Sequence, residues 1–363
     1  MEEVLKLTPQ SILKLKNSRP IAVCWAGFYG KVCFDILQSH MVQASYYLAK
    51  SPGVTEYCGL PVYDLNNLPY PPEETTLIVA MDPYQLPNQI QKIKAAVQFA
   101  QLAILDEQDI INHCLHYDLE LFRNRGMDVH SAVLDFGFMR LHNPMMECPA
   151  YQKAFALQAK DLILPEMGDT TWMTEGPYTF GPAGLRSGDV VLDCGANIGI
   201  FSAYAAAKGC CVFAFEPHTE TQAYFMLNQE LYSKQIQLIP KAIGARCGNA
   251  HLNVYGQDWG ANSIVMKLDA PDLSIECVDV ITIDSFIEQY GLSSVDFIKA
   301  DIEGAERQLL LGAQKILKRD APKLAICTYH LPDDAEILPQ LIRQGNPQYH
   351  IEATKEKIFA WPV

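Results

Sequence analysis

The sequence predicts an α/β protein that contains two parallel sheets, one in each half of the chain. Short apolar runs alternate with stretches of helical spacing along most of the 363 residues, which is the pattern of strands joined by crossover helices. Two of these runs end in an acid, Asp193 and Glu216. A turn that contains Gly195 and Gly199 separates the first run from a helix-like stretch. The unit therefore reads as β-α-β with acids at both strand ends.

The composition limits the classes of partner. Hydrophobic residues make up 49% and charged residues 19% of the chain, which is enough apolar material for a sizeable core. The net charge of −14 and the absence of a basic stripe argue against nucleic acid. The 11 cysteines include no C-x-x-C pair, which favours reduced thiols and a cytoplasmic protein. We expect no signal peptide and no membrane span, because the chain has no apolar stretch of ~18 residues.

Residues 1–115 are expected to form the smaller domain, a Rossmann-like α/β domain. Its expected strands are residues 20–25, 44–48, 77–80 and 102–105. Its expected helices are residues 31–40 and 85–99. Residues 59–63 read as a turn-rich connection. Residues 116–170 read as a helical and loop bridge.

The first glycine turn of this domain does not predict binding of NAD. Trp25 stands where the first glycine of a dinucleotide fingerprint belongs, and Lys50 follows the strand that should end in a ribose-binding acid. Gly27 and Gly30 are expected to allow close packing of strand and helix, with a sugar or nucleotide fragment as the alternative ligand.

Residues 171–363 are expected to form the larger domain, with a seven-stranded sheet. Its expected strands are residues 190–193, 211–216, 236–240, 295–301, 323–328, 348–353 and 358–361, the last two as a terminal hairpin. Its expected helices are residues 198–208, 219–231, 284–290, 304–317 and 334–343, and residues 249–255 and 275–282 read as a longer β pair. This order matches a doubly wound sheet.

The second glycine turn predicts an adenosine ligand. Glycines let backbone amides approach a ligand closely, and an acid such as Glu216 suits the two hydroxyls of a ribose. The turn lacks both the G-x-G-x-x-G spacing and the lysine of a phosphate loop. A cofactor without a pyrophosphate fits better, and S-adenosylmethionine is the candidate.

The order of elements resembles that of class I S-adenosylmethionine-dependent methyltransferases, and within them the FkbM family. The segments that carry the likeness are residues 191–199, 215–217, 242–244, 262–264, 283–285, 296–306 and 329–330. The likeness covers about residues 170–363. The resemblance implies O-methylation of a hydroxyl on a sugar or secondary-metabolite scaffold, as in natural-product or polysaccharide biosynthesis.

The resemblance also implies the cofactor contacts. Asp193 is expected near the amino group of the cofactor. Gly195, Ala196, Asn197 and Gly199 would line its methionine part. Glu216, followed by Pro217, would bind the ribose, and His218 would flank adenine. The alternative for Glu216 is that it stabilises the dipole of the next helix.

Asp301, Glu303, Glu306 and His330 are the candidate catalytic group. Asp301 ends an expected strand, and Glu303 and Glu306 are spaced to share a helix face. The acids could raise the pKa of one carboxylate, which would make it a general base. They could instead hold a divalent metal, although we expect none, or interact with the helix dipole and Arg307. His330 is expected to act as a base or to bind substrate.

The sequence leaves open the roles of two further segments and the choice among several functions. The loop of residues 259–263 could contact the ligand, and Trp172 with residues 175–178 could cover the cofactor. The partner would be a small-molecule or glycan acceptor with a free hydroxyl, and a homo-oligomer is open. The alternatives are a non-catalytic cofactor-binding or assembly subunit, methyl transfer to nitrogen or carbon, and an NAD-dependent oxidoreductase.

Overall fold

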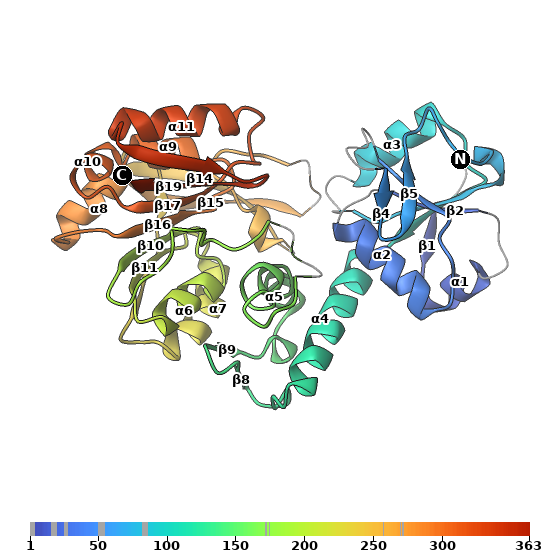
Figure 1. Ribbon diagram of the computed structural model, residues 1–363, viewed down its shortest axis with the longest axis horizontal. Helices are drawn as coiled ribbons and strands as arrows, with labels where there is room; N and C mark the ends of the chain where they lie inside the picture. The colour runs from blue at the N-terminus through green and yellow to red at the C-terminus, as the bar shows by residue number, and fades with distance from the viewer. Residues whose placement is uncertain are drawn as a thin grey trace. The chain divides into compact units, whose positions relative to one another are not determined.

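The chain folds into two compact units, residues 1–121 and 122–363, each with its own seven-stranded sheet (Figure 1). The computed structural model describes residues 4–15, 20–24, 28–49, 55–81, 86–170, 173, 175–256, 258–268, 270 and 272–363. Trp25, Gly27, Lys50 and Trp172 lie outside the described residues. Among the helices that are described, none is long and apolar enough to cross a bilayer.

The first unit is a parallel α/β fold, as predicted. Its strand order is β1-β7-β6-β2-β3-β5-β4, and every neighbouring pair is parallel except β4 with β5. Its elements are β1 (Leu5–Leu7), α1 (Pro9–Lys14), β2 (Ile21–Cys24), α2 (Phe28–Ser39), β3 (Tyr46–Leu48), β4 (Glu56–Tyr57), β5 (Leu60–Tyr63), η2 (Pro72–Glu74), β6 (Thr76–Val79), α3 (Leu86–Ala96), β7 (Gln101–Leu105) and α4 (Glu107–Asn124). The prediction for residues 59–63 was wrong, because residues 60–63 form a strand that pairs with β3.

The second unit contains the larger sheet, in the order β12-β11-β10-β16-β17-β19-β18. All neighbours are parallel up to β17, and β19 runs antiparallel to both β17 and β18. Its elements are β8 (Val133–Asp135), β9 (Arg140–His142), η3 (Pro144–Met146), α5 (Pro149–Leu162), β10 (Val190–Cys194), α6 (Ile200–Ala207), β11 (Cys211–Phe215), α7 (Thr219–Glu230), β12 (Ile236–Ile239), β13 (Ala242–Ile243), β14 (Gly248–Tyr255), η4 (Trp259–Ala261), β15 (Leu273–Ile281), α8 (Ile283–Tyr290), β16 (Phe297–Ala300), α9 (Glu306–Leu311), α10 (Gln314–Arg319), β17 (Lys323–Cys327), α11 (Asp334–Gly345), β18 (Tyr349–Ala353) and β19 (Lys357–Pro362). The predicted seven-stranded sheet is confirmed.

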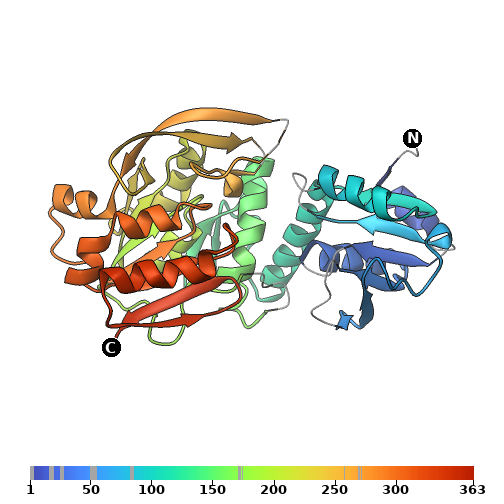
Figure 2. The same cartoon turned by 90° about the horizontal axis from the view of Figure 1, so that it is seen from above.

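Helices cover both faces of this sheet. Helices α6 and α7 lie on one face, and α8 to α11 lie on the other (Figures 1 and 2). The face under α8 to α11 holds a large apolar core that includes Phe215, Ile298, Leu309 and Leu338, all fully or almost fully buried. The buried core fixes the sheet, so the carboxyl ends of β10, β11 and β16 meet at one edge.

Two details differ from the expected elements. The stretch predicted as one helix over residues 304–317 is two short helices, α9 and α10, because the chain breaks at Gly312. A Cβ at Gly312 would lie 2.3 Å from the carbonyl oxygen of Gly244, so the break lets these backbones pack together. The expected β pair is β14 with β15, but it belongs to a separate three-stranded sheet with β13.

Candidate active site

The glycine turn after β10 is packed tightly against the ends of two other strands. The amides of Gly195 and Ala196 both donate to the Phe215 carbonyl at the end of β11, at 3.1 and 3.0 Å. Gly195 has a φ of 77°, and a Cβ there would lie 1.8 Å from the Asp301 carbonyl oxygen. The glycine is therefore required so that the turn and the end of β16 can approach each other.

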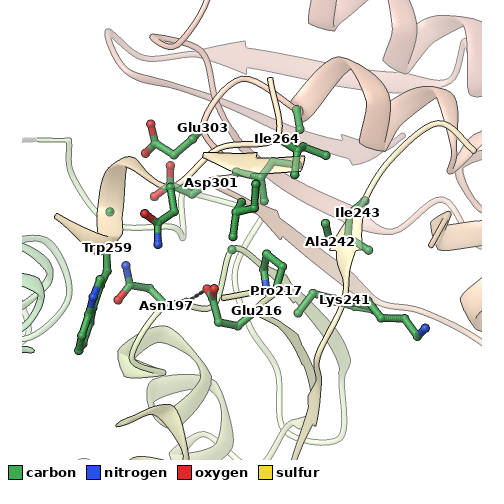
Figure 3. Close-up of a pocket in the computed structure, with 17 residues that line it drawn as sticks. Asn197, Glu216, Pro217, Lys241, Ala242, Ile243, Trp259, Ile264, Asp301 and Glu303 are labelled. Atoms are coloured by element: carbon green, nitrogen blue, oxygen red, sulfur yellow. Dashed lines mark hydrogen bonds between the residues drawn. The ribbon is translucent and has the colours of Figure 1, made fainter. Parts of the chain in front are cut away.

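Glu216 is held at the end of β11 by backbone amides. Its Oε2 accepts from the Asn197 amide at 3.0 Å (Figure 3), and its Oε1 accepts from the His218 amide at 2.9 Å. The side chain is buried, and burial raises the pKa of Glu216 to about 7 although the two amides oppose it. Each carboxylate oxygen keeps a lone pair for a hydroxyl donor. The Glu216 carboxylate is thus oriented to accept hydrogen bonds from the two hydroxyls of a diol.

A pocket with about 540 Å³ of empty space, open to solvent, lies at this edge of the sheet. Gly195, Asn197, Glu216, Pro217, Asp301 and Glu303 all line it, so strand-end residues predicted for the cofactor and for catalysis share one cavity (Figure 3). Asp193, Ala196, Gly199, His218 and His330 are not in its wall. The wall also includes Trp259, Gly260 and Asn262 of the loop that was expected to contact ligand.

Of the four cofactor candidates outside the pocket wall, Gly199, Ala196 and His218 are buried within the unit. Gly199, with a φ of 86°, precedes α6, and a Cβ there would lie 2.9 Å from the ring of Phe225. Ala196 is buried. His218 is buried too, and its Nδ1 lies 2.7 Å from Thr221 Oγ1. The ring of His218 therefore meets protein groups rather than the pocket.

Asp193 is completely buried and forms an ion pair with Lys299. Lys299 Nζ lies 3.1 Å from Asp193 Oδ1 and donates to the Gly195 carbonyl at 2.6 Å. Ser202 Oγ donates to Asp193 Oδ2 at 2.6 Å. Burial opposes the charge of Lys299, but the charges of Asp193 and Asp301 raise its pKa. In this structure Asp193 anchors the lysine that fixes the glycine turn.

Asp301 accepts hydrogen bonds from two tyrosines. Tyr178 Oη donates to Oδ2 at 2.6 Å, and Tyr329 Oη donates to Oδ1 at 3.2 Å. Burial opposes ionisation, yet the charges of Lys299 and His330 and the Tyr178 hydroxyl lower the pKa of Asp301 to about 2. Asp301 is consequently a fixed anion at neutral pH rather than a proton acceptor.

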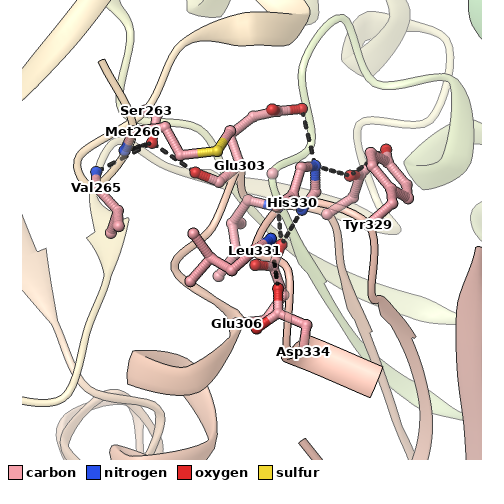
Figure 4. Close-up of polar contacts among 12 residues, drawn as sticks. Ser263, Val265, Met266, Glu303, Glu306, Tyr329, His330, Leu331 and Asp334 are labelled. Atoms are coloured by element: carbon pink, nitrogen blue, oxygen red, sulfur yellow. Dashed lines mark hydrogen bonds and ion pairs between the residues drawn. The ribbon is translucent and has the colours of Figure 1, made fainter. Parts of the chain in front are cut away.

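His330 lies beside the carboxylates of Glu303 and Glu306 (Figure 4), and the carboxylate of Asp301 is also close. Its Nε2 is 3.3 Å from Glu303 Oε1 and 3.7 Å from Asp301 Oδ1, and its Nδ1 is 3.1 Å from Glu306 Oε1. Burial lowers the pKa of His330, but Glu303 and Glu306 raise it to about 11 overall. The imidazole is therefore a cation at neutral pH, which does not fit the expectation that it accepts a proton.

Glu303 has a different environment from Glu306. Helix α9 begins at Glu306, so Glu303 lies in the preceding turn with a φ of 51°, and the two acids do not share a helix face as predicted. Burial raises the pKa of Glu303 to about 7 in spite of His330. Arg307 pairs with Asp333 and Asp334 instead of these acids. Glu303 is the acid of the cluster whose pKa suits proton transfer.

Two groups of described residues could hold a metal ion by distance. Asp301, Glu306 and His330 offer ligand atoms within 4.8 Å of one another, and so do Glu175, Asp301 and Cys327. Asp301 already accepts hydrogen bonds from Tyr178 and Tyr329, and the two ring nitrogens of His330 lie beside Glu303 and Glu306.

Lys299 and Tyr329 are site residues to which the sequence gave no role, and for Tyr178 it gave no contact with Asp301. Tyr178 belongs to the segment expected to cover the cofactor; nearby, Lys357 Nζ donates to the carbonyls of Glu175 and Gly176 at 3.1 and 3.0 Å. Lys299 is a charge within the fully buried strand β16. A buried lysine is rare unless it is paired. The position of Lys299 inside an expected buried strand was therefore the signal that could have identified it.

Comparison with known proteins gives the family of this unit. Residues 193–348 match the family of Methyltransferase FkbM domains. The chain is 27% identical over 209 residues to a 31-O-demethyl-FK506 methyltransferase FkbM of Streptomyces tacrolimicus, which covers 48% of this chain and 78% of that protein. It is 28% identical over 143 residues to Methyltransferase 1 of Beauveria bassiana, which covers 34% of this chain and 57% of that protein.

A solved structure of methyltransferase FkbM from Methylobacillus flagellatus KT is also similar. The alignment covers 97% of this chain and 92% of that one, at 17% identity and a TM-score of 0.43. The strand order of the larger sheet, with its antiparallel β19 between β17 and β18, is that of the class I methyltransferase fold expected from the resemblance. The match to the family of Methyltransferase FkbM domains thus falls on residues 193–348, within the second unit.

Proposed function

We propose that the protein transfers a methyl group from S-adenosylmethionine to a hydroxyl of a small-molecule or glycan acceptor. One observation carries the proposal: the pre-oriented Glu216 and the near-neutral Glu303 line the same pocket. The relative from Streptomyces tacrolimicus is by name a 31-O-demethyl-FK506 methyltransferase, which supports oxygen as the methyl acceptor.

The residues of the pocket fit the cofactor. Glu216 has two free lone pairs for the ribose hydroxyls. Ala242, Ile243, Leu252 and Ile264 form an apolar part of the wall that suits a flat purine. When bound, the cofactor supplies a methyl group that its sulfonium already activates. The protein then has to align the acceptor and take up one proton.

Glu303 is the proposed proton acceptor, in place of His330. A base must have an appreciable ionised fraction at the working pH and a pKa near it, and Glu303, with a pKa of about 7, meets both requirements at neutral pH. His330 would stabilise the ionised Glu303 from 3.3 Å. Asp301, anionic throughout, would contribute a fixed negative charge that favours a cationic ligand.

The test is a calorimetric titration of the full chain with S-adenosylmethionine and S-adenosylhomocysteine. We expect both to bind, and we expect Glu216→Ala to weaken binding at least about tenfold through loss of two charge-assisted hydrogen bonds. Thr219→Ala, on the first residue of the following helix, is the matched control. Absence of binding by the wild type, or unchanged binding by Glu216→Ala, would refute the proposal.

The acceptor class needs a separate experiment. Incubation with radiolabelled S-adenosylmethionine and panels of hydroxylated sugars, polyketides and amines should label hydroxyl compounds only. For an acceptor found in this way, Glu303→Gln should reduce turnover about 10²- to 10⁴-fold while the cofactor still binds. Labelling confined to amines would refute methyl transfer to oxygen.

A further inference from the structure

Trp259 and Asn262 line the pocket, and each carries a buried hydrogen-bond donor, Trp259 Nε1 and Asn262 Nδ2, that has no partner among the described residues. Trp259 is only 4% exposed. Leaving a donor buried and unpaired costs free energy, and such groups in native proteins call for an explanation. A ligand that carries acceptor atoms would supply the missing partners.

The orientation of the Asn262 side-chain amide is fixed by the hydrogen bond of its oxygen. Its Oδ1 accepts from the Tyr255 amide at 2.9 Å, which requires oxygen at that position, so the unpaired atom is the nitrogen. Next to it, Ser263 Oγ donates to the Glu303 carbonyl at 2.5 Å. Asn262 is thereby tied to the same turn that carries the proposed base.

The turn that bears Trp259 is anchored on its other side. Lys153 Nζ of α5 forms a buried ion pair with Asp258 Oδ2 at 2.7 Å. The ring of Trp259 packs against Tyr224, with centroids 5.0 Å apart. Both donors are therefore held in place before any ligand binds, which lowers the entropic cost of binding.

The position of Trp259 in the pocket indicates which part of the ligand lies near it. Trp259 and Asn197 lie toward one end of the pocket, and Lys241, Ala242 and Ile243 lie toward the other (Figure 3). Glu216 lies between these ends. If the ribose is bound at Glu216 and the purine at the apolar end, the amino-acid part of the cofactor extends toward Trp259.

The amino-acid part of the cofactor ends in a carboxylate. Among the described residues that line the pocket, no cation is free to pair with this carboxylate. Lys241 is the single cation among the residues that line the pocket. Its Nζ pairs with Asp279 at 2.8 Å and points away from the cavity. Neutral donors must then satisfy the carboxylate. We infer that Trp259 Nε1 and Asn262 Nδ2 bind the carboxylate of the cofactor's amino-acid end, an inference that rests on the proposed function.

The experiment compares two thioether ligands that differ at this end. S-adenosylhomocysteine carries the amino-acid carboxylate, and 5′-methylthioadenosine lacks it. Trp259→Phe removes the donor and keeps an aromatic ring, and Asn262→Asp keeps the acceptor for Tyr255 and replaces the donor with a like charge. By calorimetry we expect each variant to lose about tenfold or more in affinity for S-adenosylhomocysteine. Affinity for 5′-methylthioadenosine should change less than about twofold.

Tryptophan fluorescence gives a second readout that does not depend on turnover. S-adenosylhomocysteine should change the emission of the wild type and of the control Trp361→Phe, whose ring packs on His350 away from the pocket. Trp259→Phe should lose that change. Equal losses of affinity for both ligands, or no loss for either, would overturn the inference, with circular dichroism showing that the variants are folded. Failure of the wild type to bind either ligand would instead count against the proposed function.

Discussion

Replacement of Lys299 by methionine should destabilise the second unit strongly. Lys299 lies opposite Asp193 in the register of β16 with β10, and both side chains are buried, at 5% and 0% exposure. Methionine fills a similar volume but leaves the Asp193 carboxylate with Ser202 as its remaining donor. It also leaves the Gly195 carbonyl without the lysine donor.

The size of the effect follows from the burial of the pair. Removal of one partner of a buried ion pair typically costs about 3–5 kcal/mol, because the remaining charge stays desolvated. Replacement of both partners by uncharged groups is often close to neutral. The double variant Asp193→Asn/Lys299→Met should therefore regain most of the loss, since asparagine still offers Ser202 an acceptor. For a unit of this size, the single variant should melt about 10 °C lower.

Scanning calorimetry and urea unfolding measure these effects, with the transition of the second unit identified by its shift on addition of S-adenosylhomocysteine. Lys241→Met is the matched control, because its pair with Asp279 is exposed and should be worth less than about 1 kcal/mol. A loss below about 1 kcal/mol for Lys299→Met, or a double variant as unstable as the single one, would refute the reasoning.

Three further predictions concern the pocket. Gly195→Ala should abolish cofactor binding in calorimetry and destabilise the unit, because its Cβ would overlap the Asp301 carbonyl, whereas Gly188→Ala, with a φ of 91° and open space around it, should cost only about 1 kcal/mol. Affinity for S-adenosylhomocysteine should fall as the pH drops below about 7, since protonated Glu216 accepts fewer hydroxyl donors, and Glu216→Gln should remove this part of the pH dependence. The acid limb of kcat/KM should have its midpoint near pH 7 and should vanish in Glu303→Gln; an unchanged limb would exclude Glu303 as the base.

The fold and the cofactor side of the pocket could be predicted because their signals are local in the sequence. Strands β10 and β11 are short apolar runs, and Glu216 follows the second run directly. Since parallel strands place their carboxyl ends at one edge, Glu216 and Asp301 had to converge once both strands were recognised. The break at Gly312 could not be predicted in this way, because it depends on contact with Gly244, which is distant in the chain.

The electrostatics of the catalytic group could not be predicted for the same reason. The Asp193–Lys299 pair depends on the register of two strands, and Tyr178 reaches Asp301 across 123 residues of sequence. Without these partners, the sequence left open which acid of the cluster, or His330, would accept the proton. The reference pKa of histidine, about 6.5, made His330 attractive, and only the surrounding carboxylates show that it is a cation.

The distribution of charge in the cluster explains why one acid is left to act as a base. Lys299 and the tyrosines stabilise the charge of Asp301, and the amide of Ile302 donates to Glu306 at 2.9 Å. Glu303 faces burial and the like charges of Asp301 and Glu306, with His330 as its main counterion, and the balance raises its pKa to about 7. A cluster with one cationic imidazole thus gives unequal acids: one remains ionised, and another can exchange a proton near neutral pH. Under the proposed function, Glu303 is the acid of this cluster that would take up the proton of the acceptor hydroxyl.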